Sequence, residues 1–155
     1  MKRMLMGVAA MVLIVSAAGV SRAEEITGQF TRIKIEHNVT RDGQKGMLIH
    51  VAFDIENAHG KQCGVLVLFA DADNQPIEGV SKKFRGKNGQ LFVAAGFQPE
   101  ASQDSWKGSL FLPYKEIKLD AGEHTIKVIV GVICPEAANP LVIEPQAKTV
   151  IFTRK

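Results

Sequence analysis

The chain has 155 residues, of which 46% are hydrophobic and 23% are charged. This length and composition are those of one globular domain with a continuous core. The sequence contains no low-complexity run, no heptad pattern and no convincing internal repeat. The formal net charge of +3 would by itself suggest an anionic partner such as nucleic acid.

The first 23 residues predict a cleaved signal peptide. Lys2 and Arg3 make a short basic region, and residues 4–20 carry no charge. Residues 21–23, Ser-Arg-Ala, place small side chains three before and one before a cut, so we expect cleavage after Ala23. A membrane anchor is the alternative, but the apolar stretch is rich in Ala and Gly and no basic stop follows it.

Cleavage there leaves residues 24–155 as a single domain without net charge. Three of the 19 basic residues, Lys2, Arg3 and Arg22, lie in the signal, and the remaining 16 match the 16 acidic residues. The charge argument for a nucleic-acid or membrane-surface partner therefore fails. We expect an exported protein, periplasmic or secreted, with no nucleic-acid partner and no stable membrane span after signal cleavage.

A period of two predicts β-strands along most of this domain. From Met47 to Ile55, apolar side chains alternate with residues such as His50 and Asp54, as in a strand with one face in the core. Residues 65–70 are apolar on both faces, which is typical of a central strand. The other expected strands are Ile26–Glu36 with a break at Gly28, Gln90–Phe97, Trp106–Leu112, His124–Ile133 and Lys148–Arg154.

Seven short strands without a long helical stretch favour an antiparallel β-sandwich. Only PYKEIKL, from Pro113, is expected to form a helical turn. The following LDAGEHTIKVIV resembles the corner at which the chain crosses between the sheets of immunoglobulin-like sandwiches. Leu119 would be its apolar plug, Gly122 would supply a positive φ, and His124 stands where a corner tyrosine bonds back to the backbone. We predict an all-β, immunoglobulin-like sandwich of about seven strands.

The two cysteines, Cys63 and Cys134, predict a disulfide, because an even cysteine count in an exported chain favours pairing. Cys63 precedes the third strand and Cys134 ends the sixth. These strands are antiparallel neighbours in an immunoglobulin-like layout, so both thiols reach the same edge of the sandwich. Two buried thiols are the alternative. A bridge would stabilise the fold by roughly 4 kcal/mol through the long loop that it closes.

Three phrases, KGMLIHVAFDIENAHGKQC, GQLFVAAGFQP and SLFLPYKEIKLDAGEH, together resemble a family of exported bacterial β-sandwich domains of uncharacterised function. Some members are joined to caspase-like or repeat-containing modules. The resemblance covers about residues 45–130, and its most specific piece is the apolar strand into Pro113 and Tyr114, followed by Glu116, Leu119 and Gly122. It implies the sandwich fold and an accessory or interaction role, and it supplies no catalytic residue.

Metal-ligand patterns are weak throughout the domain. His59 and Cys63 are four apart, but glycines make that stretch a loop and Cys63 is expected in the disulfide. Asp71, Asp73 and Asn74 begin a stretch that resembles a calcium loop. Its sixth and twelfth positions hold Pro and Lys where such a loop needs Gly and Glu. We expect a hairpin turn there, with calcium as the alternative, and no cofactor.

Catalytic patterns are also weak, so we expect the protein not to be an enzyme. Glu100 and Asp104 form a loose pair of the kind that glycosidases use, but their separation cannot be derived from a loop sequence. The serines lie in no nucleophile-elbow motif; they are Ser81, Ser102, Ser105 and Ser109. A hydrolase is therefore the least favoured function.

Binding residues are expected on loops. A basic stretch of residues 82–89 suits an acidic or phosphate-bearing partner, or else is a solvated loop that guards a sheet edge; its cations are Lys82, Lys83, Arg85 and Lys87. Trp106 and Tyr114, the only residues of their kinds, would form a stacking platform for a sugar. Trp106 begins a strand, and a place in the core is its alternative.

We therefore expect a non-catalytic binding or accessory module that acts through another exported protein. Carbohydrate or cell-wall binding is the alternative. The candidate loops are residues 71–76, 82–89 and 98–105.

Overall fold

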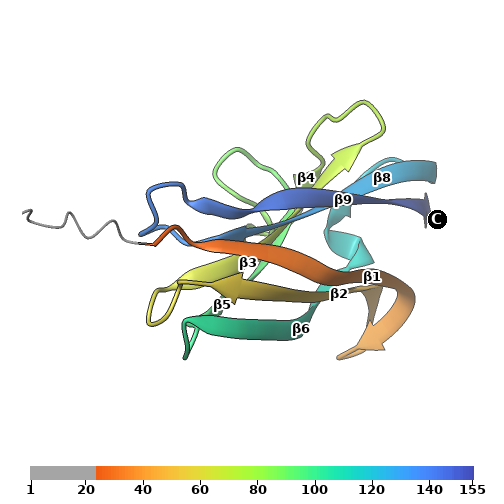
Figure 1. Cartoon of the computed structure of the whole chain (residues 1–155). Coiled ribbons are helices and arrows are strands. Elements are labelled where there is room, and N and C mark those ends of the chain that lie inside the picture. Colours follow the sequence, from red (N-terminus) through yellow and green to blue (C-terminus); the bar gives the residue numbers. More distant parts are fainter. Residues whose placement is uncertain (1–23) are drawn as a thin grey trace, which may run out of the picture.

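The computed structural model describes residues 24–155, and the predicted signal peptide, residues 1–23, lies outside the described residues (Figure 1). The described chain consists of nine strands and two 3₁₀ turns, η1 and η2, with no α-helix. None of its helical segments is long and apolar enough to cross a membrane. The elements are β1 (Thr27–Arg41), β2 (Gln44–Glu56), β3 (Cys63–Asp71), β4 (Glu78–Gly79), η1 (Lys82–Phe84), β5 (Phe92–Phe97), β6 (Gln103–Pro113), η2 (Tyr114–Glu116), β7 (Ile117–Lys118), β8 (Gly122–Ile133) and β9 (Leu141–Arg154).

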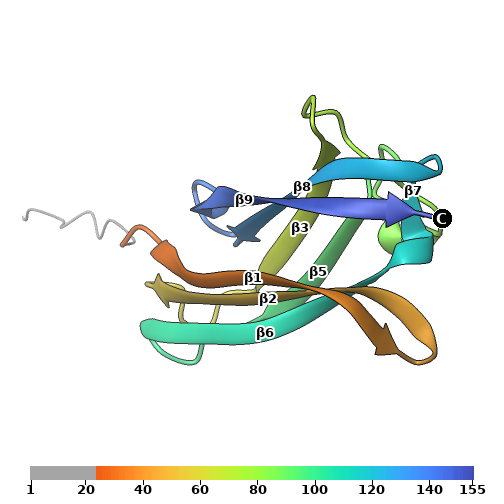
Figure 2. The ribbon, with the colours of Figure 1, turned by 90° about the vertical axis from the view of Figure 1, so that its right-hand side faces the viewer.

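Two antiparallel sheets pack face to face as a β-sandwich (Figures 1 and 2). One has the strand order β1-β2-β6 and the other has the order β5-β3-β8-β9. Alternate side chains of β2, β3 and β8 point between the sheets, because successive residues of a strand face opposite sides. The core between the sheets is made chiefly of Met47, Ile49, Val51, Phe53 and Ile55 of β2, Val65, Val67 and Phe69 of β3, and Ile126, Val128, Val130 and Val132 of β8.

The described residues contain nine strands, where the sequence predicts about seven. The two additional strands, β4 and β7, have two residues each and pair with one another in a separate small sheet. The last strand begins at Leu141 and not near Lys148 as predicted. Its pairing with β8 is irregular on both sides of Val132, which lets the chain pass Pro145 and then resume the ladder.

The predicted break at Gly28 is wrong. Gly28 pairs with Ile55 inside β1. The two irregularities in this strand pair come later, between Phe30 and Arg32 and between Glu36 and Val39. A Cβ on Gly28 would lie 2.5 Å from the carbonyl oxygen of Asp54 and 2.8 Å from a side-chain carbon of Ile143. Because glycine has no side chain, β1 can lie this close to Asp54 and Ile143.

The corner predicted from LDAGEHTIKVIV joins the two sheets. The chain leaves β6 through η2 and β7 and enters β8 of the other sheet at Gly122, which has a φ of 120°. Leu119 is half-buried and packs against the core. His124 Nε2 lies 2.7 Å from the carbonyl oxygen of Asp120, so its ring makes the backbone contact expected of the corner residue.

Cys63 and Cys134 form the predicted disulfide. Gly64 of β3 pairs with Ile133 of β8, so the residues just outside this pair meet at one end of the sandwich. Both cysteines are buried, and their Cα atoms lie 4.2 Å apart. The bridge joins two central, neighbouring strands and is of the kind that persists in oxidising compartments.

Candidate functional site

The four edge strands of the sandwich differ in how they are protected against pairing with another chain. β1 and β9 are interrupted by register irregularities, and β9 also contains Pro145 and Lys148. β6 carries Asp104 and Lys107. In contrast, β5 has the sequence FVAAGF, pairs regularly with β3 and contains no charge and no proline. Charges, prolines and bulges are the usual guards of an edge strand, so among residues 24–155 the unguarded edge is β5 itself. Just before β5, Leu91 is bridged to Arg85 of the basic loop.

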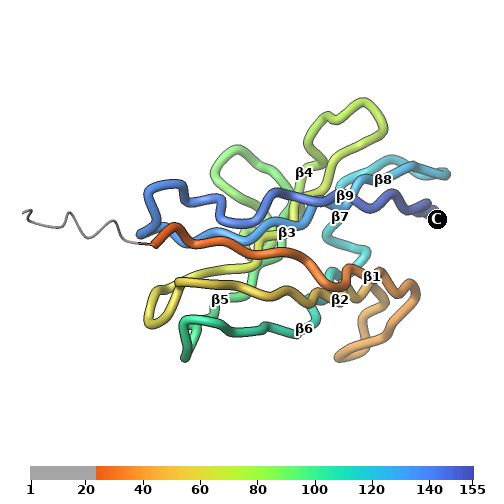
Figure 3. The backbone as a smooth tube through the Cα atoms, in the orientation of Figure 1, coloured from red at the N-terminus to blue at the C-terminus, as the bar shows by residue number. Residues whose placement is uncertain are grey.

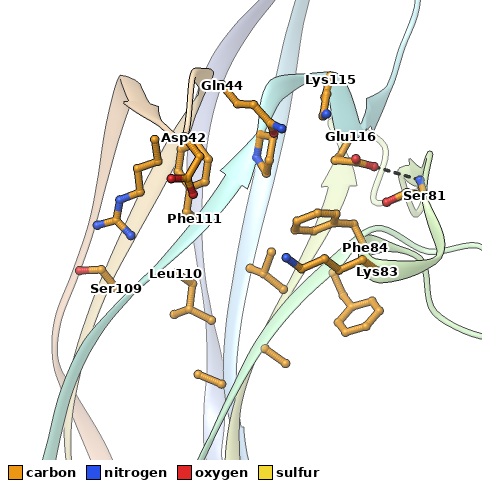
Figure 4. Close-up of a pocket in the computed structure, with 16 residues that line it drawn as sticks. Asp42, Gln44, Ser81, Lys83, Phe84, Ser109, Leu110, Phe111, Lys115 and Glu116 are labelled. Atoms are coloured by element: carbon orange, nitrogen blue, oxygen red, sulfur yellow. Dashed lines mark hydrogen bonds between the residues drawn. The ribbon is translucent and has the colours of Figure 1, made fainter.

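A groove of about 780 Å³ runs between β5 and β6, the edge strands of the two sheets (Figure 4). Val93 of β5 and Leu110 of β6 are buried and give it an apolar floor. In Figure 4, Leu110 and Phe111 lie on one side, while Lys83 and Phe84 of η1 lie on the other. Volumes of this size are typical of binding sites.

The charges that line the groove are mostly positive. They comprise three cations and two acids, which are Arg41, Lys83, Lys115, Asp42 and Glu116. Glu116 is buried, with 6% of its surface exposed, and its Oε2 accepts a hydrogen bond of 2.9 Å from the backbone N–H of Ser81 (Figure 4). Since Glu116 already serves to hold η1 against η2, the remaining charges favour an acidic ligand.

The outer faces of the two sheets differ in polarity. The three-stranded sheet presents charged side chains such as Arg32, Lys34 and Lys107. The four-stranded sheet, which includes β5, presents mainly apolar side chains outside the core, namely Leu66, Leu68, Phe92, Ile129, Ile133, Leu141 and Ile151. Ile151 is 62% exposed and Leu141 is 42% exposed. The unguarded edge thus borders an apolar face, a combination that is typical of protein-binding surfaces.

The three predicted binding loops do not form one surface. Residues 98–102 connect β5 to β6 at the end of the sandwich where Cys63 pairs with Phe97. Residues 72–77 follow the opposite end of β3 (Figure 3). Of the predicted basic residues in 82–89, Lys83 lines the groove, while Lys82, Arg85 and Lys87 surround a separate surface hollow.

The acidic loop after β3 is a hairpin turn in the structure. Asp71 Oδ1 accepts hydrogen bonds of 2.9 Å from the backbone N–H groups of Asp73 and Gln75, as turn-forming aspartates do. Asn74 Oδ1 accepts a bond from Lys127 Nζ at 2.6 Å. Among residues 24–155, no group of three or more His, Cys, Asp or Glu side chains is placed to hold a metal ion.

The two predicted aromatic binding residues pack within the protein. The ring of Trp106 is half-buried and stacks on Phe53 with a centroid separation of 5.5 Å. Tyr114 packs on Phe152 at 5.0 Å, and its hydroxyl accepts a hydrogen bond from the backbone N–H of Asn38 at 2.9 Å. These contacts assign both rings a structural role.

A polar network on the outer face of the three-stranded sheet was not found by sequence reasoning. His50 Nδ1 lies 2.8 Å from Ser109 Oγ, and its Nε2 lies 2.9 Å from Glu36 Oε2. The three residues come from β2, β6 and β1, so only the strand register brings them together. The hydrogen bond to His50 lowers the pKa of Glu36.

Asp104 holds the loop before β6 through two backbone hydrogen bonds. Its carboxylate accepts bonds from the N–H groups of Glu100 at 2.9 Å and Ser105 at 2.8 Å. Both bonds favour the charged form, and the one from Glu100 contributes most to lowering the pKa of Asp104. The pair that resembled glycosidase carboxylates is therefore joined through a backbone amide.

This lowered pKa makes part of the stability depend on pH. The contribution is complete above the unfolded-state pKa of Asp104 and is lost as the pH falls through the lower folded-state pKa. We expect Asp104→Asn to destabilise the protein at about pH 7 and to have a smaller effect at about pH 2.5. Urea unfolding at both pH values measures this. Asp73→Asn, at an exposed turn position, is the control; an equal pH dependence in both variants would contradict the assignment.

No family model matches the chain, and no curated protein sequence is similar to it. A solved structure described as "X-ray structure of Northeast Structural Genomics Consortium target SoR45" aligns with 85% of this chain and 89% of its own. The two sequences are 10% identical and the TM-score is 0.28. A similarity at this level assigns neither fold nor function.

Proposed function

We propose that the protein is an exported binding module that takes an extended segment of another exported protein as an added strand along β5. The observation that carries this proposal is the unguarded edge of β5 beside an apolar groove. In strand addition, main-chain hydrogen bonds to the free edge give affinity, and pockets for alternate side chains give specificity.

The groove supplies apolar and charged contacts for the side chains of the added strand. A strand added to β5 extends the four-stranded sheet over the gap toward β6, so its inward side chains meet the floor at Val93 and Leu110. Lys83, Lys115 and Arg41 are available to acidic side chains of the same segment. The partner is therefore an extended stretch with alternating apolar residues and at least one acid.

An immunoglobulin-like topology is part of the proposal. If the seven long strands are lettered A to G in chain order, the sheets are A-B-E and D-C-F-G. Constant-type immunoglobulin domains have A-B-E-D and C-F-G, so the central pairings agree and the fourth strand has changed sheets. This agreement supports the resemblance to exported bacterial sandwich domains, and the disulfide supports an exported location.

A glycan partner has less support from the arrangement of aromatic rings. Sugar-binding faces need exposed rings, whereas Trp106 stacks on Phe53 and Tyr114 packs on Phe152. A glycan remains one outcome of the experiment below.

A charge placed on β5 tests the proposal. Ala94 is exposed and pairs regularly with Leu66, so Ala94→Lys adds an edge guard without disturbing the core. We expect this variant to lose a partner that crosslinks to the exported wild-type protein, while its melting temperature stays the same. Thr149→Lys, an exposed position on the edge strand β9, is the matched control. Equal partner recovery with both variants, or recovery of glycan alone, would overturn the proposal.

A further inference from the structure

We propose that Ser109 is an activated nucleophile that accepts an acyl group from an activated ester, with His50 as its general base. This inference rests on a different observation from strand addition at β5, although both use the same groove and Arg41. It rests on the network Glu36–His50–Ser109, in which the imidazole lies within hydrogen-bond distance of a hydroxyl on one side and a carboxylate on the other.

The carboxylate determines which nitrogen of His50 is free to act as a base. An ionised Glu36 only accepts hydrogen bonds, so the proton of the neutral imidazole resides on Nε2, 2.9 Å from Glu36 Oε2. Nδ1 is then unprotonated and accepts the hydroxyl proton of Ser109 at 2.8 Å. This division of roles is that of a Ser-His-acid triad, with the two ring nitrogens exchanged.

The strand register explains why the three side chains meet. His50 and Ser109 are directly paired across β2 and β6, so their side chains leave the sheet on the same face. Lys34 is the direct partner of His50 on β1, and Glu36 is two residues further along that face. The carboxylate therefore reaches the ring diagonally across the strand pair.

Ser109 is exposed and lines the groove between β5 and β6 (Figure 4), so an acyl group can approach it from solvent. Phe111 lies two residues further along the same face of β6, and the Arg41 guanidinium lies 5.8 Å from the centre of its ring. Arg41 also lines the groove and is the cation that we assign to the developing oxyanion.

The reaction balances without a cofactor or oxidant. Ser109 Oγ attacks the carbonyl carbon of the ester and its proton passes to His50 Nδ1. The new Oγ–C bond forms first and gives a tetrahedral oxyanion. The oxyanion then collapses, the bond from the carbonyl carbon to the leaving oxygen breaks, and the leaving oxygen takes the proton from His50. The products are acylated Ser109 and an alcohol.

Ser105 provides an internal control on the same strand face. Its hydroxyl donates a hydrogen bond of 2.7 Å to Asp54 Oδ1, with no imidazole between them. A carboxylate is a much weaker base than a neutral imidazole near neutral pH, so a carboxylate partner activates a serine far less. If exposure alone determined acylation, the two serines would react alike.

The test uses p-nitrophenyl acetate and residues 24–155, with nitrophenolate release followed by absorbance and the acetylated residue found by peptide mass spectrometry. We expect acetyl on Ser109 and a rate at least about 100-fold lower in His50→Gln. Ser105→Ala is expected to react as the wild type does. Acetyl distributed equally over Ser105 and Ser109, no acetylated serine, or an unchanged rate in His50→Gln would overturn the proposal.

Glu36 is a positioning residue, and its role has a separate readout. Nitrogen-15 NMR of the imidazole is expected to show the Nε2-protonated tautomer in the wild type and a loss of that preference in Glu36→Leu. The same variant is expected to acylate more slowly at Ser109. An unchanged tautomer with an unchanged acylation rate would contradict the assignment. His50, Ser105 and Glu36 all lie on the solvent-facing side of the sheet, so unchanged melting temperatures of the three variants exclude misfolding as the cause.

Discussion

Replacing both cysteines with alanine, Cys63→Ala/Cys134→Ala, is expected to lower the free energy of unfolding by roughly 4 kcal/mol. The bridge joins residues separated by 71 positions, so its loss returns much conformational freedom to the unfolded chain. Both side chains are buried, and alanine leaves no unpaired polar atom in their place. Urea unfolding of the oxidised wild type and the variant measures the difference.

Reduction of the wild-type protein is the matched control, because it removes the bridge and keeps both sulfur atoms. The reduced wild type and the double variant are expected to unfold at similar urea concentrations. Before reduction, the wild type is expected to take up no thiol-alkylating label. Labelling at two thiols, or a loss of stability below about 1 kcal/mol, would contradict a structural bridge.

Phe53→Ala is expected to destabilise the protein by about 3–5 kcal/mol. Phe53 of β2 is fully buried, and its ring contacts Phe30, Phe97 and Trp106 with centroid separations of 6.1, 5.3 and 5.5 Å. These rings belong to β1, β5 and β6, so one truncation loosens contacts within one sheet and across to the other. Trp106 fluorescence is expected to shift to longer wavelength in the folded variant as the ring loses its stacked partner.

Ile151→Ala is the control for a large apolar side chain outside the core. Ile151 is 62% exposed, and its truncation is expected to change stability by no more than about 0.5 kcal/mol. Similar losses in Phe53→Ala and Ile151→Ala would contradict the position of the core between the two sheets.

The sequence predicts the elements of this fold well because they depend on local chemistry. The alternation of apolar and polar residues predicts β2 and places Phe53 on its core face. The turn at Gly122 marks the corner between the sheets. The disulfide follows from the order of the third and sixth long strands and needs no knowledge of side-chain packing. The short strands β4 and β7 lack such a signal, since two residues show no period.

The candidate sites depend on which strands become neighbours, which local sequence does not specify. Glu36 reaches His50 only because the register shift between Phe30 and Arg32 precedes it; a slip of one residue would turn Glu36 to the other face. The unguarded composition FVAAGF is visible in the sequence. Its significance appears only when β5 is known to be an edge strand.

Strand addition at β5 is tested most directly by photo-crosslinking in the exporting cell. A photoreactive side chain at Ala94 of β5 is compared with one at Thr149 of β9, both of which are exposed. The proposal predicts a crosslink from Ala94 alone, to an extended segment of one exported protein that contains an acidic residue. A partner captured equally from both positions, or from Thr149 alone, would contradict it.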